Sequence, residues 1–135
     1  MAKLTVPRNH LWTAYFDAAN RLTDSVDTAR NDWARNYGPD NTVASTVTPM
    51  GGRAVYTYDS RGKVLTATDA INFTASFTYD AQSNLQTARD RNGNQTSYRY
   101  TDNGNLQRVT DAQNHPTTYG VDGYGRVTGV THRNA

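Results

Sequence analysis

The sequence predicts an all-β fold, an antiparallel meander of about six 21-residue repeats with two strands in each. One pattern is written three times at a spacing of 21 residues, as YTYDSRGKVLTATDAINFTAS, FTYDAQSNLQTARDRNGNQTS and YRYTDNGNLQRVTDAQNHPTT, and the partial copy YGVDGYGRVTGVTHRNA follows. Two turn signals recur in each clear repeat, and the composition favours strands. A period of this length is typical of an array whose repeats pack only on their neighbours, so we expect a curved, solenoid-like β-strip.

The composition of the 135 residues supports strands and excludes several classes of protein. All 12 acidic residues are Asp, and the chain has 20 Thr and 9 Tyr. Thr and Tyr favour strands, whereas the Glu and Lys of helix surfaces are absent or rare. The net charge of +2 does not indicate a nucleic-acid partner. Without cysteine there is no disulfide, and no apolar stretch has the length of a signal peptide or a membrane span.

The period extends over nearly the whole chain. Steps of 21 from Tyr58 and from Leu85 meet an aromatic or aliphatic residue in all six repeats. We therefore expect residues 1–13 to be a leader or the tail of an earlier repeat, and residues 14–135 to be one array. Its repeats lie near 14–34, 35–55, 56–76, 77–97, 98–118 and 119–135.

Residues 14–36 allow two interpretations. An amphipathic helix is indicated by apolar residues at helical spacing, namely Tyr15, Leu22, Val26, Ala29 and Trp33. Strands are indicated by residues that occupy the columns of later repeats, namely Phe16, Asp17, Asn20, Leu22 and Asp27. We favour strands, because five matched columns arise by chance less easily than a helical spacing. Residues 37–55 are the most degenerate repeat, yet they keep the spacing.

Most turn signals are an Asp followed three residues later by Gly or Asn, as in Asp59 to Gly62 and Asp90 to Gly93, although Thr101 replaces Asp in one copy and Ser83 replaces Gly or Asn in another. The carboxylate can cap a type I turn, and the last residue must tolerate a positive φ. We assign as turn caps Asp59, Gly62, Asp69, Asp80, Asp90, Gly93, Gly104, Asp111, Asp122 and Gly125.

The strand before the first turn alternates between apolar and polar residues, so one face should be an aromatic and aliphatic ladder and the other a face of Thr, Ser, Arg and Gln. In the second strand the apolar residues are three apart, as in Leu106 and Val109, which predicts a bulge or a strong bend. We assign as the structural core of the repeats Phe16, Tyr37, Tyr56, Tyr58, Phe77, Tyr79, Tyr98, Tyr100, Leu22, Val43, Val64, Leu85, Leu106 and Val127.

The repeated pattern Tyr-x-Tyr-Asp-x-x-Gly-x-Leu-x-x-Val-Thr-Asp-x-x-Gly resembles the YD repeat of the RHS family. The matching stretches are YTYDSRGKVLTATDAIN, FTYDAQSNLQTARDRNG and YRYTDNGNLQRVTDAQN. The resemblance implies a β-strip that spirals into a hollow shell, as in bacterial RHS toxins, insecticidal toxin complexes and teneurins. It also implies a secreted or cell-surface location, and as partners the rest of a larger RHS shell and its toxin domain. We expect a fragment of such a shell or a short relative.

Catalytic and ligand chemistry has little support in the sequence. His10, His115 and His132 have no recurring Ser or Asp partner, so we expect no catalytic residue and no enzyme. The Asp columns could chelate calcium, but Thr and Gly interrupt them, so we expect turn caps and no metal or cofactor. Arg89, Arg99 and Arg108 do not recur at the 21-residue spacing, so we expect no groove that tracks the phosphates of a nucleic acid. Tyr rings could stack on a sugar, which leaves a carbohydrate-binding or adhesion module as a further alternative.

The main alternative to a shell wall is a self-assembling structural protein. An open sheet leaves unpaired backbone groups at its end strands, and an apolar face with nothing in the chain to cover it. The chain would then associate with itself, through its edge strands or face to face. In a filament, residues 10–13 of the next copy would complete the last repeat by head-to-tail strand pairing.

Overall fold

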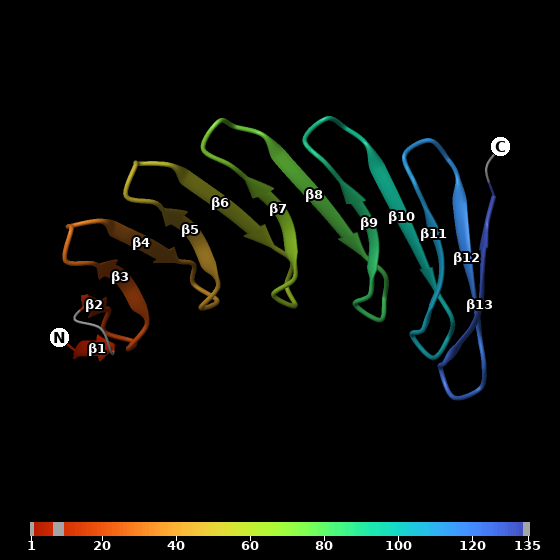
Figure 1. Ribbon diagram of the computed structural model, residues 1–135, viewed down its shortest axis with the longest axis horizontal. Helices are drawn as coiled ribbons and strands as arrows, with labels where there is room; N and C mark the ends of the chain where they lie inside the picture. The colour runs from red at the N-terminus through yellow and green to blue at the C-terminus, as the bar shows by residue number, and fades with distance from the viewer. Residues whose placement is uncertain (1, 7–9, 134–135) are drawn as a thin grey trace. The chain divides into compact units, whose positions relative to one another are not determined.

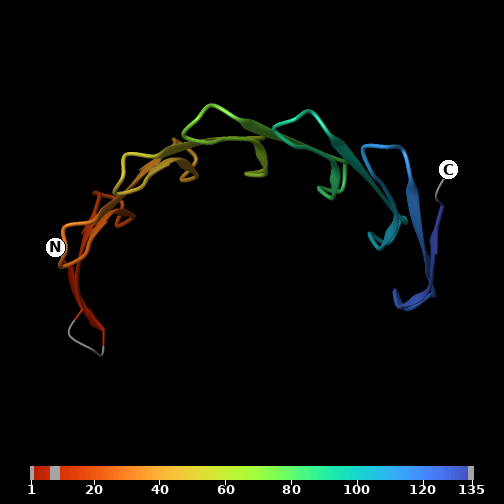
Figure 2. The same cartoon turned by 45° about the horizontal axis from the view of Figure 1, so that its top comes forward.

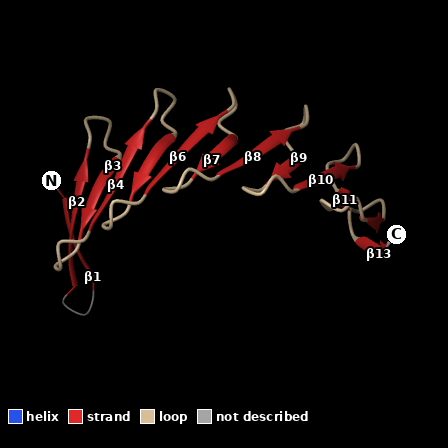
Figure 3. Cartoon of the chain, turned by 90° about the horizontal axis from the view of Figure 1, so that it is seen from above, coloured by secondary structure: helices blue, strands red, loops and turns tan. Residues whose placement is uncertain are grey.

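The computed structural model describes residues 2–6 and 10–133, and their side chains from residue 12 onward. Every regular element in these ranges is a β-strand (Figure 3). The chain divides into two compact units, Met1–Phe73 and Thr74–Ala135. The predicted all-β antiparallel meander is thus confirmed.

The first unit is a meander of seven strands (Figure 1). Each strand in it pairs antiparallel with the next along the chain. The strands are β1 (Ala2–Val6), β2 (His10–Phe16), β3 (Leu22–Val26), β4 (Asp32–Tyr37), β5 (Val43–Val47), β6 (Arg53–Tyr58) and β7 (Val64–Thr68).

The second unit is a meander of six strands with the same antiparallel pairing. The strands are β8 (Thr74–Tyr79), β9 (Leu85–Arg89), β10 (Gln95–Tyr100), β11 (Leu106–Thr110), β12 (Pro116–Val121) and β13 (Val127–His132).

The strands follow the 21-residue register. In the first unit, β2, β4 and β6 end at Phe16, Tyr37 and Tyr58. Residues 14–36 form strands, so the register was the right interpretation and the helical stripe was not. Residues 2–6 form the strand β1, and β2 begins at His10, four residues before the position where we expected the first repeat to start.

A β-bulge recurs beside the first turn of every repeat. Tyr58 pairs with Val64 while Thr57 pairs with Thr66, so Leu65 is the extra residue. The same shift occurs in β2, β4, β8, β10 and β12, one residue before the end of each strand. The bulge explains the spacing of three: Leu106 pairs with Tyr100 and Val109 with Tyr98, and these two rings share a face.

The turns adopt the conformation that their residues favour. The last residue of the first turn has a positive φ in all six repeats, at Asn20, Asn41, Gly62, Ser83, Gly104 and Gly125. The second turn repeats this at Arg30, Gly51, Asn72, Gly93 and Asn114. Gly and Asn enter this region at little cost, whereas Arg and Ser do so less readily.

The strands of each unit form a single layer (Figure 2). Among the residues whose side chains are described, no hydrophobic one is fully buried. Ser45 is the one buried residue in this set, with 1% of its area exposed. Most ladder residues are half-buried, but Phe16 and Val127 are 43% and 59% exposed. The ladder is therefore a half-buried face, because a lone sheet has no second layer to cover it.

Candidate functional site

The aromatic face is formed by the alternating residues of the longer strand in each repeat. In β6, Tyr56 lies opposite Ala67 and Tyr58 lies opposite Val64. Each ring thus meets a small or aliphatic side chain on the neighbouring strand, which is a favourable cross-strand combination. The predicted residues of the ladder come to one face within each unit.

Two tyrosines connect a repeat to the one before it. The hydroxyl of Tyr37 donates to the carbonyl oxygen of Leu22, and that of Tyr58 donates to the carbonyl oxygen of Val43, each at 2.8 Å. Leu22 and Val43 are the first residues of their strands, directly before the bulge. Burial raises the pKa of the Tyr58 phenol. Each bond therefore fixes both the ring and the turn region of the preceding repeat.

The first unit holds two departures on the aromatic face. The rings of Trp12 and Trp33 lie 5.0 Å apart between centroids at a tilt of 38°. Arg35 takes the column of Tyr56, and its Nη1 is buried without a hydrogen-bond partner. Arg35 thus places hydrogen-bond donors in a column that holds aromatic rings in the later repeats.

Arg21 joins the first turns of two successive repeats in the first unit. Its Nε donates to the carboxylate of Asp17 at 2.7 Å, and its Nη1 donates to the side-chain oxygen of Asn41 at 3.0 Å. The guanidinium also lies over the Tyr37 ring, 4.6 Å from the centroid. This contact adds a cation–π attraction to the tyrosine link.

The Asp residues of the turns accept hydrogen bonds from the backbone. In the turn after β6, Oδ1 of Asp59 accepts from the N–H groups of Arg61 and Lys63, each at 2.9 Å. Asp69, Asp80, Asp90, Asp111 and Asp122 accept from the residues two and four positions later in the same way. The backbone N–H of Lys63, more than any other group, lowers the pKa of Asp59.

The same hydrogen bonds lower the pKa of other turn carboxyls. The N–H of Arg21 is the largest cause for Asp17, that of His115 for Asp111 and that of Arg126 for Asp122. For Asp90 the largest cause is the side-chain amide of Asn94. Within the described part of the chain, no three or more His, Cys, Asp or Glu residues gather as a metal site. The carboxylates are occupied by their own turns.

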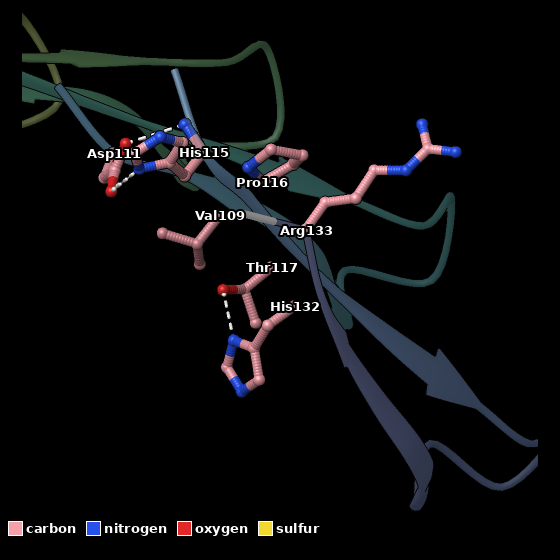
Figure 4. Close-up of a pocket in the computed structure, with 7 residues that line it drawn as sticks. All are labelled: Val109, Asp111, His115, Pro116, Thr117, His132 and Arg133. Atoms are coloured by element: carbon pink, nitrogen blue, oxygen red, sulfur yellow. Dashed lines mark hydrogen bonds and ion pairs between the residues drawn. The ribbon is translucent and has the colours of Figure 1, made fainter. Parts of the chain in front are cut away.

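A hollow of about 180 Å³ lies beside β12 and β13 (Figure 4). It contains two of the three histidines. Nδ1 of His115 lies 3.3 Å from Oδ2 of Asp111, and Nδ1 of His132 shares a 3.0 Å hydrogen bond with the Thr117 hydroxyl. The side chain of Arg133 points away from both rings (Figure 4). The side chain of His10 lies outside the described residues. Thr117 and His132 are thus hydrogen-bonded to each other, whereas the carboxylate of Asp111 lies beside the other ring, that of His115.

Sequence reasoning missed two features of the repeats. The tyrosine hydroxyl bonds were not predicted, although Tyr rather than Phe in the column of Tyr37 and Tyr58 was an available signal. The cross-strand pairs of the polar face were missed as well, because their spacing of nine residues depends on where the bulge lies. Thr57 and Thr66 are such a pair, with their hydroxyl oxygens 2.6 Å apart.

The comparisons with known proteins agree with the repeat pattern. The family model described as RHS Repeat matches residues 58–96 and 79–114. The expected resemblance to the RHS family is thus confirmed. No curated protein is significantly similar to the chain in sequence.

Solved structures share the fold. The crystal structure of TcdB2-TccC3 has a TM-score of 0.76 at 15% identity, and the match covers 90% of this chain and 7% of that one. A Photorhabdus luminescens Tc holotoxin pore that carries a TccC3 mutant has a TM-score of 0.77 at 11% identity over 91% of this chain and 7% of that one. TcdB2-TccC3 without its hypervariable C-terminal region reaches 0.78 at 10% identity over 91% and 8%.

The chain therefore spans less than a tenth of the length of these proteins. At such low identity the likeness shows the fold. In the described ranges no helix has the length and apolarity needed to cross a membrane.

Proposed function

We propose that this array of RHS repeats is a structural wall segment of a larger shell that encloses a toxin domain, and that it is not itself catalytic. The observation that carries the proposal is the match of 90% of the chain to a small part of the TcdB2-TccC3 structures, together with the RHS repeats of residues 58–114. The partners would be the remaining repeats of the shell and its toxin domain, and the location secreted or cell-surface.

The uncovered aromatic face of the single-layer sheet supports a role as a wall segment. Each unit is one layer whose aromatic face has no fully buried hydrophobic residue among the described side chains. A wall that continues on both sides would pair its edge strands and enclose this face. In this proposal residues 14–135 are one array, residues 1–13 are a leader or the tail of an earlier repeat, and the ladder and turn-cap residues serve structure alone.

A graft into a known shell tests the proposal. The stretch of TccC3 that superposes on this chain is replaced by residues 14–135, and the product is expressed with TcdB2. A wall segment keeps the complex intact, as judged by co-purification and electron microscopy. A control graft carries the same residues with Tyr58 and Tyr79 changed to Asp and should not assemble. An intact complex from the control, or none from the unaltered graft, contradicts the wall role.

A second function, head-to-tail self-assembly, is favoured by the exposure of β13. All six of its residues are exposed, and Val127 and Val130 are 59% and 50% accessible. The strand carries neither Asp, Lys nor Pro, the residues that usually protect an edge. Light scattering on the purified chain separates the two proposals. Concentration-dependent polymers with a regular axial repeat in micrographs favour the filament, and discrete monomers or dimers favour the wall.

A further inference from the structure

A row of four polar side chains crosses the polar face of the second unit. The register places Arg99 of β10 opposite Arg108 of β11, Arg108 opposite Thr118 of β12, and Thr118 opposite Thr131 of β13. These strands are neighbours in chain order (Figure 1). At the usual strand spacing the row is about 14 Å long. We call these residues the arginine row.

The pair at the start of the row departs from its repeat. Tyr15 lies opposite Asp24 in the first repeat and Gly120 opposite Gly129 in the last. The pairs of the three repeats between the first and that of Arg99 are Asn36 with Ser45, Thr57 with Thr66 and Thr78 with Thr87. In each of them the two side chains share a hydrogen bond, of 3.1, 2.6 and 2.7 Å respectively. Arg99 and Arg108 are both donors and both positive, so they cannot satisfy each other. Like charges directly opposite destabilise a sheet.

The four strands that carry the row hold no carboxylate to compensate this pair. The sequences of β10 to β13 contain neither Asp nor Glu. At the neighbouring turns, Asp111 is paired with His115 and Asp122 with Arg126, and the exposed Asp102 forms no ion pair in the described structure. Among the described residues, neither arginine of the row takes part in an ion pair. The row is therefore a concentrated positive charge that the fold itself does not require.

Two shallow hollows follow the row. One of about 300 Å³ is lined by Arg99, Gln107, Arg108 and Thr118. The other, of about 310 Å³, is lined by Arg108, Pro116, Thr118, Thr131 and Arg133. Guanidinium and hydroxyl donors thus converge on space large enough for more than one acidic side chain.

We propose that the arginine row docks an acidic segment of a partner protein, with Arg99 and Arg108 binding its carboxylates and Thr118 and Thr131 donating further hydrogen bonds. Guanidinium binds carboxylate through paired hydrogen bonds. The backbone N–H groups of these strands donate to the carbonyl groups of the neighbouring strands. They therefore form no nest of free amides that could bind a phosphate. The rings of this unit that could stack on bases, such as Tyr98 and Tyr100, belong to the opposite face.

The repeat supplies the variant that tests the proposal. Arg99→Thr with Arg108→Thr installs the Thr pair of the two preceding repeats, so the sheet should fold with an equal or higher thermal midpoint. The charge-matched control is Arg53→Thr with Lys63→Thr, which removes two exposed positive residues of the first unit. Affinity of the full chain for a fluorescent poly-glutamate peptide is measured by anisotropy, with poly-glutamine, inorganic phosphate and a single-stranded oligonucleotide as competitors.

The expected result is a loss of poly-glutamate affinity of about tenfold or more in the Arg99, Arg108 variant, and a change within about twofold in the control. The proposal is overturned if both variants bind equally, or if the chain prefers poly-glutamine as much as poly-glutamate. It is likewise overturned if phosphate or the oligonucleotide displaces the peptide at much lower concentration, because the row would then serve a phosphate-bearing ligand.

Discussion

The hydroxyl of Tyr58 reaches back across one repeat and donates a 2.8 Å hydrogen bond to the carbonyl oxygen of Val43, fifteen residues earlier. The bond joins the end of β6 to the first residue of β5, beside the bulge. It makes the packing of one repeat depend on the presence of the repeat before it.

Tyr58→Phe should destabilise the chain by about 1 kcal/mol, because the ring stays in place while the Val43 carbonyl loses its donor. Urea unfolding followed by circular dichroism measures the change. Tyr56→Phe is the matched control, since Tyr56 lies on the same face and strand but makes no such hydrogen bond in the described structure. Equal losses in both variants would show that the hydroxyl contact contributes nothing.

Tyr79→Asp should lower the stability by more than about 2 kcal/mol or prevent folding, because a charge would enter the aromatic ladder. Thr78→Asp, one residue earlier on the exposed face, should cost less, because its carboxylate stays in solvent and can still accept a hydrogen bond from the Thr87 hydroxyl. Thermal unfolding of both variants is the measurement. A soluble Tyr79→Asp variant with an unchanged midpoint would contradict the assignment of faces.

Gly62 should accept Asn and reject Val. Its φ is 76° and nothing lies within 4 Å of the position that a Cβ would take, so conformation rather than space decides the outcome. Asn already fills this position at Asn20 and Asn41. Gly62→Asn should be nearly neutral and Gly62→Val should cost about 1–2 kcal/mol in urea unfolding. A Val variant as stable as the Asn variant would refute this view of the turn.

The turn carboxyls should make the fold sensitive to acid. The pKa values of Asp17, Asp59, Asp90, Asp111 and Asp122 lie below the ordinary value of 3.8. A carboxyl group whose pKa is lower in the folded than in the unfolded state stabilises the fold. This contribution is complete at pH values above the unfolded pKa and is lost as the pH falls through the folded pKa. The temperature of the thermal midpoint should therefore decrease when the pH is lowered below about 4, and it should change little at higher pH.

Asp59→Asn separates the charge from the cap. Asn keeps an acceptor for the N–H groups of Arg61 and Lys63 but does not titrate, so the midpoint should fall less steeply in acid. Asp102→Asn is the control, because Asp102 is exposed and caps no turn in the described structure. An unchanged acid slope in Asp59→Asn, or a change as large in the control, would contradict the role of the cap.

The register of Tyr58 and Leu85 predicted the strands, the turns and the place of the bulge, because period and turn chemistry are local properties of the chain. The register could not predict which residues lie opposite each other on neighbouring strands. The bulge changes which residues face each other, so the opposition of Arg99 and Arg108 became visible only with the pairing. The buried Nη1 of Arg35 depends on packing between neighbouring strands and has no sequence signature.

The hairpin of β12 and β13 lacks the tyrosine link that joins successive repeats in the first unit. Val121 stands in the column of Tyr58 and has no hydroxyl to donate to Leu106, and Gly120 lies opposite Gly129 where other repeats pair side chains. In a structure whose repeats depend on their neighbours, such a hairpin opens at the smallest free-energy cost. Its amide protons should exchange with deuterium sooner than those of β10 and β11, so unfolding of the second unit has a preferred starting end.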